Sequence, residues 1–160
     1  MKKEWIAVSL LLALPGLLYA APHQASAPKQ QETAEKPVYL FDLLKKQPYA
    51  NLWKKTVWDK VPNKKDPNFS WLKSGGTTSP AIIAKVGNET YYKMEACKPH
   101  FCGGDYDILV LMNKKKVMAL QLYALPKGNV ANGRKMEKMY GHPTTLERRY
   151  FDAWKKNFGH

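Results

Sequence analysis

Both cysteines of the chain and one of its four histidines lie within the six residues 97–102, which read Cys-Lys-Pro-His-Phe-Cys. Two cysteines separated by four residues can close a short disulfide ring if the backbone bends back. Pro99 favours such a bend because it fixes its own φ and restricts Lys98 before it. His100 would then stand at the apex of the ring. A ring this small gains little from loop-closure entropy, so we expect it to preset a local conformation rather than to hold a domain together.

The same three side chains could in principle serve a metal or a redox reaction. Cys97, His100 and Cys102 all carry donor atoms, but three ligands within six residues lack the two-pair spacing of structural zinc sites. Redox motifs of the thioredoxin type place two residues between their cysteines, whereas this chain has four. The sequence therefore predicts neither a bound metal nor another cofactor.

The remaining histidines and carboxylates do not form a recognisable catalytic set. His23, His142 and His160 have no nucleophile partner that the sequence makes visible. Asp105 and Asp107 could act as paired carboxylates of a hydrolase, but alternate residues at a strand end lie on one side without any sign of a perturbed pKa. We therefore expect a protein that is not an enzyme.

The N-terminus has the three parts of a secretory signal. A basic start is followed by an apolar run over 5–18 and by small residues at Ala20 and Ala21. The apolar run is short and contains Pro15, which favours a cleaved signal peptide over residues 1–20 and argues against a membrane span. Export would place the cysteines in an oxidising compartment, where a disulfide is permitted.

The part that follows the signal divides into a leader and one domain. Residues 21–36 are rich in Pro, Gln, Ala, Ser and Lys and predict a disordered leader, which leaves 37–160 as a single domain. The whole chain carries a formal charge of +13. Removal of the signal peptide leaves about +12. Pairs of lysines are typical of surfaces that bind nucleic acid. An exported basic protein instead meets anionic envelope polymers or lipid, so we expect no nucleic-acid partner.

Apolar residues at helical spacing indicate helices at both ends of the domain. Such spacing predicts short helices over 38–46 and 49–58. Near the C-terminus, Thr144 followed three residues later by Glu147 matches a capping box, which predicts that a closing helix begins there. Residues 129–142 are basic and have no clear period, so the sequence makes no firm prediction for them.

Between these helices, runs of β-rich composition predict two hairpins, 81–86 with 89–95 and 107–112 with 116–123. Residues 97–104 then join two antiparallel neighbours, so the cysteine ring should protrude from one end or face of the sheet. Strands flanked by helices predict an α+β fold, with an antiparallel sheet of about five strands that helices cover on one face.

A resemblance to a known family begins at the cysteine ring. The segment 97–103, preceded by Lys-Ser-Gly-Gly-Thr-Thr-Ser-Pro-Ala at 73–81 and Gly-Asn-Glu-Thr-Tyr at 87–91, resembles the Ivy family, the bacterial periplasmic inhibitors of vertebrate lysozyme. The likeness extends over about residues 71–123. It implies an antiparallel sheet with flanking helices and a protruding disulfide loop that enters the lysozyme cleft.

The resemblance also assigns roles to residues of the ring. In that family the loop histidine lies between the two catalytic carboxyl groups of the enzyme, and His100 matches it. The family motif usually carries Asp where this chain has Phe101. The implied inhibitory loop is Lys98, Pro99, His100 and Phe101, held by a disulfide between Cys97 and Cys102.

Three functional hypotheses follow. The first is an inhibitor of C-type lysozyme that defends a bacterium against innate immunity. The second keeps the loop mechanism but directs it at the bacterium's own lytic transglycosylases. The third is a basic module that binds peptidoglycan or anionic glycans of the envelope. Because vertebrate lysozymes are themselves basic, Asp105, Asp107 and Glu137 are the acidic residues expected to offset repulsion. Whether the chain forms a homodimer stays open.

Overall fold

The computed structural model describes residues 36–103, 106–127 and 130–157. The predicted signal peptide and the leader up to residue 35 lie outside these ranges. The helical elements of the described chain are α1 Leu40–Leu43, α2 Tyr49–Thr56, the 3-10 turn η1 Trp58–Lys60, α3 Pro67–Ser70, the 3-10 turn η2 Trp71–Lys73, and α4 Thr145–Asn157. The strands are β1 Thr77–Thr78, β2 Ile82–Val86, β3 Glu89–Cys97, β4 Tyr106–Met112, β5 Val117–Lys127 and β6 Val130–Tyr140.

These strands form one antiparallel sheet. Its order is β1-β3-β4-β5-β6, with β2 pairing β3 beside β1. Every pairing is antiparallel, so the predicted α+β fold is confirmed. The sheet has six strands rather than about five. Both predicted hairpins are present, and the additional strands are the two-residue β1 and the long β6.

Strand β6 occupies most of the segment 129–142, for which sequence patterns predict no element. Its basic residues lack a strand signal of their own, but β5 offers a backbone ladder that runs from Ala119, opposite Tyr140, to Lys127, opposite Val130. A bulge interrupts the register between Leu125 and Lys127. Strand formation here depends on hydrogen bonding to a neighbour, which overrides a weak local propensity.

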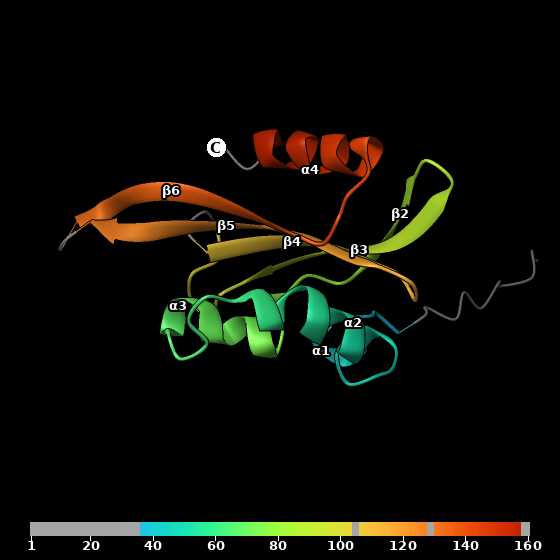
Figure 1. The fold of residues 1–160 in the computed structure, drawn as a ribbon, viewed down its shortest axis with the longest axis horizontal. Coiled ribbons are helices and arrows are strands. Elements are labelled where there is room, and N and C mark those ends of the chain that lie inside the picture. The colour runs from blue at the N-terminus through green and yellow to red at the C-terminus, as the bar shows by residue number, and fades with distance from the viewer. Residues whose placement is uncertain (1–35, 104–105, 128–129, 158–160) are drawn as a thin grey trace, which may run out of the picture. The chain divides into compact units, whose positions relative to one another are not determined.

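Helices cover both faces of the sheet, so the expectation of one covered face is wrong. Figure 1 shows α1, α2 and α3 on one side of the sheet and α4 on the other. In β4, Ile108 and Val110 pack toward α1, α2 and α3, whereas Leu109 and Leu111 pack toward α4. All four side chains are fully buried. A strand buried on both faces has a continuous apolar run instead of an alternating one, which explains the sequence Ile-Leu-Val-Leu-Met at the end of β4.

Helices form in each region where apolar spacing predicts them, although α1 covers only Leu40–Leu43 and α2 ends at Thr56. The apolar side of α2 buries Trp53, whose indole N–H donates to the Leu72 carbonyl oxygen at 2.8 Å. Burial of a side chain of this size stabilises the fold by about 3 kcal/mol. At the start of α4, the Thr144 N–H donates to Glu147 at 2.6 Å and the Glu147 N–H donates to the Thr144 hydroxyl at 3.4 Å. The predicted capping box is therefore confirmed. In the described part of the chain no helix is long and apolar enough to cross a membrane.

Candidate functional site

The cysteine ring lies where β3 ends and β4 is about to begin. Cys97, the last residue of β3, pairs with Asp107 of β4, and the Lys98 N–H extends the ladder by donating to the Tyr106 carbonyl oxygen at 3.0 Å. A disulfide joins Cys97 to Cys102, with a Cα–Cα distance of 5.1 Å. The ring expected from the cysteine spacing is therefore present. Since both sulfurs are bonded to each other, neither is a thiolate that could ligate a metal.

The backbone inside the ring forms a tight turn. The Phe101 N–H donates to the Lys98 carbonyl oxygen at 2.9 Å, which closes a four-residue turn. Pro99 occupies its second position and His100 its third, where φ is +69°. Proline followed by a residue with positive φ is the pattern of a type II turn. That third position usually holds glycine or asparagine, so a histidine there is held in a costly conformation by the ring around it.

The turn presents its histidine to solvent. Pro99, His100 and Cys102 are exposed, and Phe101 is 51% exposed. Within the described residues the His100 imidazole has no hydrogen-bond partner, so both ring nitrogens are available to a partner molecule. Lys98 differs from its neighbours because its side chain is half-buried and contacts the body of the protein.

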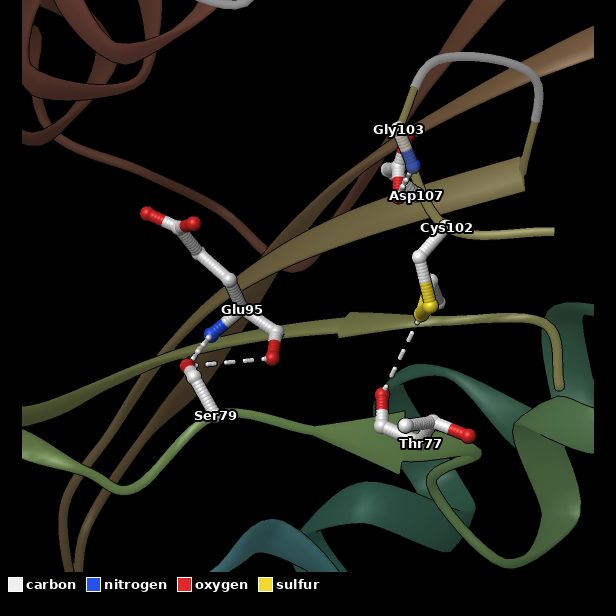
Figure 2. The surroundings of a disulfide bond; sticks show 7 residues. Thr77, Ser79, Glu95, Cys102, Gly103 and Asp107 are labelled. Carbon is white, nitrogen blue, oxygen red and sulfur yellow. Dashed lines mark hydrogen bonds between the residues drawn. A yellow bond between two sulfur atoms is a disulfide. The ribbon is translucent and has the colours of Figure 1, made fainter. Parts of the chain in front are cut away.

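The base of the loop is packed more tightly than its tip. Strand β1 pairs with the end of β3, and Figure 2 shows the Thr77 carbonyl oxygen directed at the disulfide, 3.6 Å from the Cys97 sulfur. Gly76 precedes this strand with a φ of +65°. A Cβ atom at Gly76 would lie 2.3 Å from the Cys97 carbonyl oxygen and 2.6 Å from the Trp71 ring. Only glycine allows so close an approach, which fixes where the loop leaves the sheet.

Two further contacts support the loop base. The buried Asp107 carboxylate accepts a hydrogen bond from the Gly103 N–H at 3.3 Å (Figure 2). This bond connects the segment that follows the disulfide to β4. Ser79 exchanges hydrogen bonds with the backbone of Glu95 at 3.2 Å and continues the edge of the sheet behind the disulfide.

Sequence patterns did not predict the roles of three residues that hold the loop. Asp107 is the one charged residue in the otherwise apolar strand β4. A charged residue in such a strand indicates a buried side chain that needs a hydrogen-bond partner. Tyr106 and Asn68 both contact the Lys98 side chain. Asn68 lies 30 residues away from Lys98 in α3, and no local pattern connects the two.

The acidic residues expected to offset the basic charge are used internally. Glu137 forms ion pairs with Lys155 and Arg148 of α4. The hydrogen bond from Lys155, with further help from Arg148, keeps the pKa of Glu137 below its ordinary value. Asp107 is buried, and Asp105 lies outside the described residues. Glu137 and Asp107 therefore do not form a free acidic surface for a basic partner.

A different cluster holds the start of α4 on the sheet. The Glu147 carboxylate is buried and accepts from Lys116 at 2.7 Å, from the Tyr91 hydroxyl and from the Thr144 N–H. Burial alone would raise the pKa of Glu147, but the hydrogen bonds from Lys116, Tyr91 and Thr144 lower it to about 2. The cluster borders a pocket of about 400 Å³. Its bonds are all internal, so we interpret it as a structural centre.

A basic hollow lies on the face covered by α2. It has a volume of about 450 Å³ and its lining includes Lys55, Lys60, Lys138 and His142. The Lys138 ammonium donates to the Lys60 carbonyl oxygen at 2.6 Å, and burial lowers the pKa of Lys138. No carboxylate belongs to this lining. The hollow is thus a positively charged surface feature, and none of its lining residues belongs to the disulfide loop.

Comparison with known proteins finds relatives that match part of the chain. No family model matches the chain. Two curated proteins named inhibitor of vertebrate lysozyme, from Escherichia coli strain K12 and Escherichia coli O157:H7, are each 40% identical to it over 55 residues. The match covers 34% of this chain, and the chain spans about a third of the length of these relatives, 34% in each case. The chain is therefore similar, over a third of its length, to proteins whose names describe lysozyme inhibition.

Proposed function

We propose that this protein is a periplasmic inhibitor of C-type lysozyme, which inserts the turn between Cys97 and Cys102 into the muramidase cleft. The carrying observation is the position of His100: it stands at the exposed corner of a disulfide-closed turn and has no hydrogen-bond partner among the described residues. The names of the partly matching relatives support the same target. In this proposal the protein has no catalytic activity of its own.

The chemistry of the target explains why a histidine suits this task. Lysozyme cleaves its glycan with one carboxylic acid that stays protonated and a second carboxylate that stays ionised. A neutral imidazole can accept a hydrogen bond from the protonated acid through one nitrogen and donate to the carboxylate through the other. His100 would thus join both catalytic groups while its ring blocks the site where the sugar must lie.

A loop that is already ordered loses less conformational entropy when it binds. The disulfide, the 2.9 Å turn hydrogen bond and the fixed φ of Pro99 restrict the backbone of the turn before any partner arrives. Phe101 supplies a half-exposed aromatic ring beside His100, at the position where the resembled family usually carries Asp. Its exposed edge would pack along the wall of the cleft.

The first test is inhibition of a C-type lysozyme by His100→Ala, with His142→Ala as the matched control because His142 is an exposed histidine away from the loop. We expect His100→Ala to weaken inhibition at least ~100-fold, as for a central binding residue, without changing the free energy of unfolding. His142→Ala should inhibit like the unmodified protein. Equal inhibition by all three proteins would refute insertion of His100.

Salt separates this proposal from envelope binding. A basic inhibitor and a basic lysozyme repel each other at long range, so their association should become faster, or at least not slower, as ionic strength rises. The basic hollow formed by Lys55, Lys60 and Lys138 is the observation that favours the envelope-binding alternative. Binding of anionic glycan there should weaken steeply with salt, and Lys60→Gln should reduce it. Salt-sensitive binding of the glycan without any binding of lysozyme would favour the alternative.

A comparison of targets tests the remaining alternative. Immobilised protein would be exposed side by side to C-type lysozyme and to a periplasmic extract, with His100→Ala as the control surface. Capture of lysozyme supports the leading proposal. His100-dependent capture of a lytic transglycosylase in place of lysozyme would redirect the same loop to an endogenous enzyme.

The periplasmic location is part of the proposal and has its own test. We infer that residues 1–20 are removed on export and that 37–160 form the inhibitor domain. Sequencing of the N-terminus of protein recovered from the periplasm should begin at Ala21 or one residue later. Retention of Met1, or recovery from the cytoplasm alone, would contradict it. The mass of the purified protein in solution decides whether it is a monomer or a homodimer.

A further inference from the structure

The half-buried Lys98 side chain contacts two aromatic rings. Its ammonium nitrogen lies 4.3 Å from the centre of the Phe101 ring and 4.8 Å from the centre of the Tyr106 ring. The two rings meet edge to face, with centres 6.1 Å apart and planes at 82°. Both distances from the ammonium nitrogen to a ring centre fall within the range in which a cation is attracted to an aromatic face. Lys98 therefore links the tip of the loop, at Phe101, to the first residue of β4.

A third contact anchors the same ammonium to a helix. Lys98 Nζ donates to the side-chain oxygen of Asn68 at 2.9 Å. Asn68 is itself fixed on both sides: its N–H donates to the Asp66 carboxylate and its carbonyl oxygen accepts from the Trp71 indole, each at 2.8 Å. The acceptor of Lys98 thus belongs to a short, well-bonded helix, α3, that packs against the sheet.

The Tyr106 ring is also held in place from the far side. Its hydroxyl donates to the Ala124 carbonyl oxygen at 3.2 Å, which ties the ring to β5. The partners of Lys98 are two rings and an amide, and none of its contacts among the described residues is an ion pair with a carboxylate. The positive charge of Lys98 is thus satisfied within the protein by neutral groups.

We propose that Lys98, Phe101, Tyr106 and Asn68 form an internal clamp that positions His100, and that Lys98 faces this clamp instead of the target enzyme. The inference rests on the proposed function, because it concerns how the inserting turn is aimed. Phe101 follows His100 directly, so its attachment to Lys98 fixes the direction of the turn corner. Where the resembled family usually carries an acidic residue, Phe101 supplies an aromatic face that contacts the Lys98 ammonium at 4.3 Å.

The first arm of the test needs no lysozyme. A lysine flanked by two aromatic faces has ε-methylene protons shifted upfield by the ring currents, and two-dimensional NMR of the whole protein measures this shift. We expect the Lys98 ε-protons to be shifted relative to those of Lys85, an exposed lysine on β2. Phe101→Leu should remove most of the shift and Phe101→Tyr should restore it. Lys98 ε-protons at the Lys85 position in the unmodified protein would overturn the clamp.

The second arm measures dissociation from C-type lysozyme. We expect Phe101→Leu to dissociate about tenfold faster, with Phe101→Tyr restoring the slow rate, because tenfold is the effect of one cation–π contact. Tyr106→Leu and Asn68→Ala act away from the exposed tip and should raise the rate about tenfold and threefold, whereas Tyr106→Phe, which keeps the ring, should change it little. Unfolding curves identify any variant that is simply less folded, and Asn68→Ala serves if Tyr106→Leu fails this check.

The two arms separate the clamp from the proposed function. If the unmodified protein shows the upfield shift but binds no lysozyme-like enzyme, the proposed function fails while the clamp geometry stands. If lysozyme binds and both Tyr106→Leu and Asn68→Ala dissociate like the unmodified protein, the positioning role is overturned and Phe101 acts only through direct contact with the enzyme.

Discussion

Two half-buried lysines at opposite ends of β4 are held by different chemistry. Lys98, at the loop end, is surrounded by Phe101, Tyr106 and the amide of Asn68, none of which is a carboxylate. Lys116, at the end where α4 begins, is bonded to the buried carboxylate of Glu147 at 2.7 Å. Both arrangements immobilise a cation, but only the second contains an acid that can titrate.

The difference separates a cluster that stabilises the fold from a loop whose surface is available for binding. The Glu147 cluster joins β3, the turn before β5 and α4, and it has no exposed functional side chain. The loop end instead holds one exposed turn in a fixed shape through a glycine, a disulfide and neutral contacts. We expect substitutions at the α4 end to change stability with pH, and substitutions in the loop to change binding more than stability.

The largest expected effect on stability lies at the base of the loop. Gly76→Ala places a Cβ within 2.3 Å of the Cys97 carbonyl oxygen at a position whose φ is +65°. Steric displacement and the unfavourable φ should together cost about 3–4 kcal/mol of unfolding free energy. Urea unfolding measures this cost, with Gly103→Ala as the control because a Cβ there meets nothing within 4 Å although φ is also positive. Equal losses in both variants would show that backbone conformation, not close packing, decides the effect.

The next effect tests the acid at the other lysine. Glu147→Gln should lower the unfolding free energy by about 2–3 kcal/mol at pH 7, since a carboxyl whose pKa falls from 4.5 to about 2 on folding stabilises the ionised native state. This stabilisation is complete above about pH 5 and is lost as the pH falls through 4.5 toward 2. The difference between the two proteins should shrink accordingly in urea titrations. Glu89→Gln, an exposed carboxylate beside the same pocket, is the control; a difference independent of pH would contradict the assignment.

Removal of the disulfide should have a smaller effect on stability than on binding. Replacing both Cys97 and Cys102 by serine releases a six-residue ring, for which loop-closure entropy predicts a loss of about 2 kcal/mol. The same change frees the turn that presents His100, so inhibition should weaken by a larger factor than this loss of stability would produce through unfolding. Unfolding curves and inhibition of lysozyme at one temperature provide the comparison. A double-serine variant that inhibits normally would remove the disulfide from the mechanism.

The smallest effect on stability should come from the lysine of the clamp. Lys98→Met keeps an unbranched apolar stem beside Phe101 and Tyr106 but removes the charge, so we expect a loss below about 1 kcal/mol. Because the contacts of Lys98 include no carboxylate, this loss should stay constant between pH 3 and pH 6, where that of Glu147→Gln changes. Parallel pH profiles for the two variants would erase the distinction between the two ends.

Short-range features of the site were predictable from sequence. The ring closed by Cys97 and Cys102, the turn around Pro99 and the capping box of Thr144 with Glu147 all connect residues within a few positions of each other. Their geometry depends on local backbone preferences and on covalent reach, which composition and spacing describe well.

Long-range features were decided by the tertiary structure. Strand β6 forms because β5 provides a ladder for it, and both faces of the sheet are covered because β4 is apolar on both sides, a pattern that by itself does not say which helix lies where. The contact from Asn68 to Lys98 spans 30 residues and that from Tyr91 to Glu147 spans 56. Sequence alone thus determined that a histidine-bearing ring exists, whereas the folded chain decided what holds and aims it, because contacts between distant segments form only when the sheet and helices have packed.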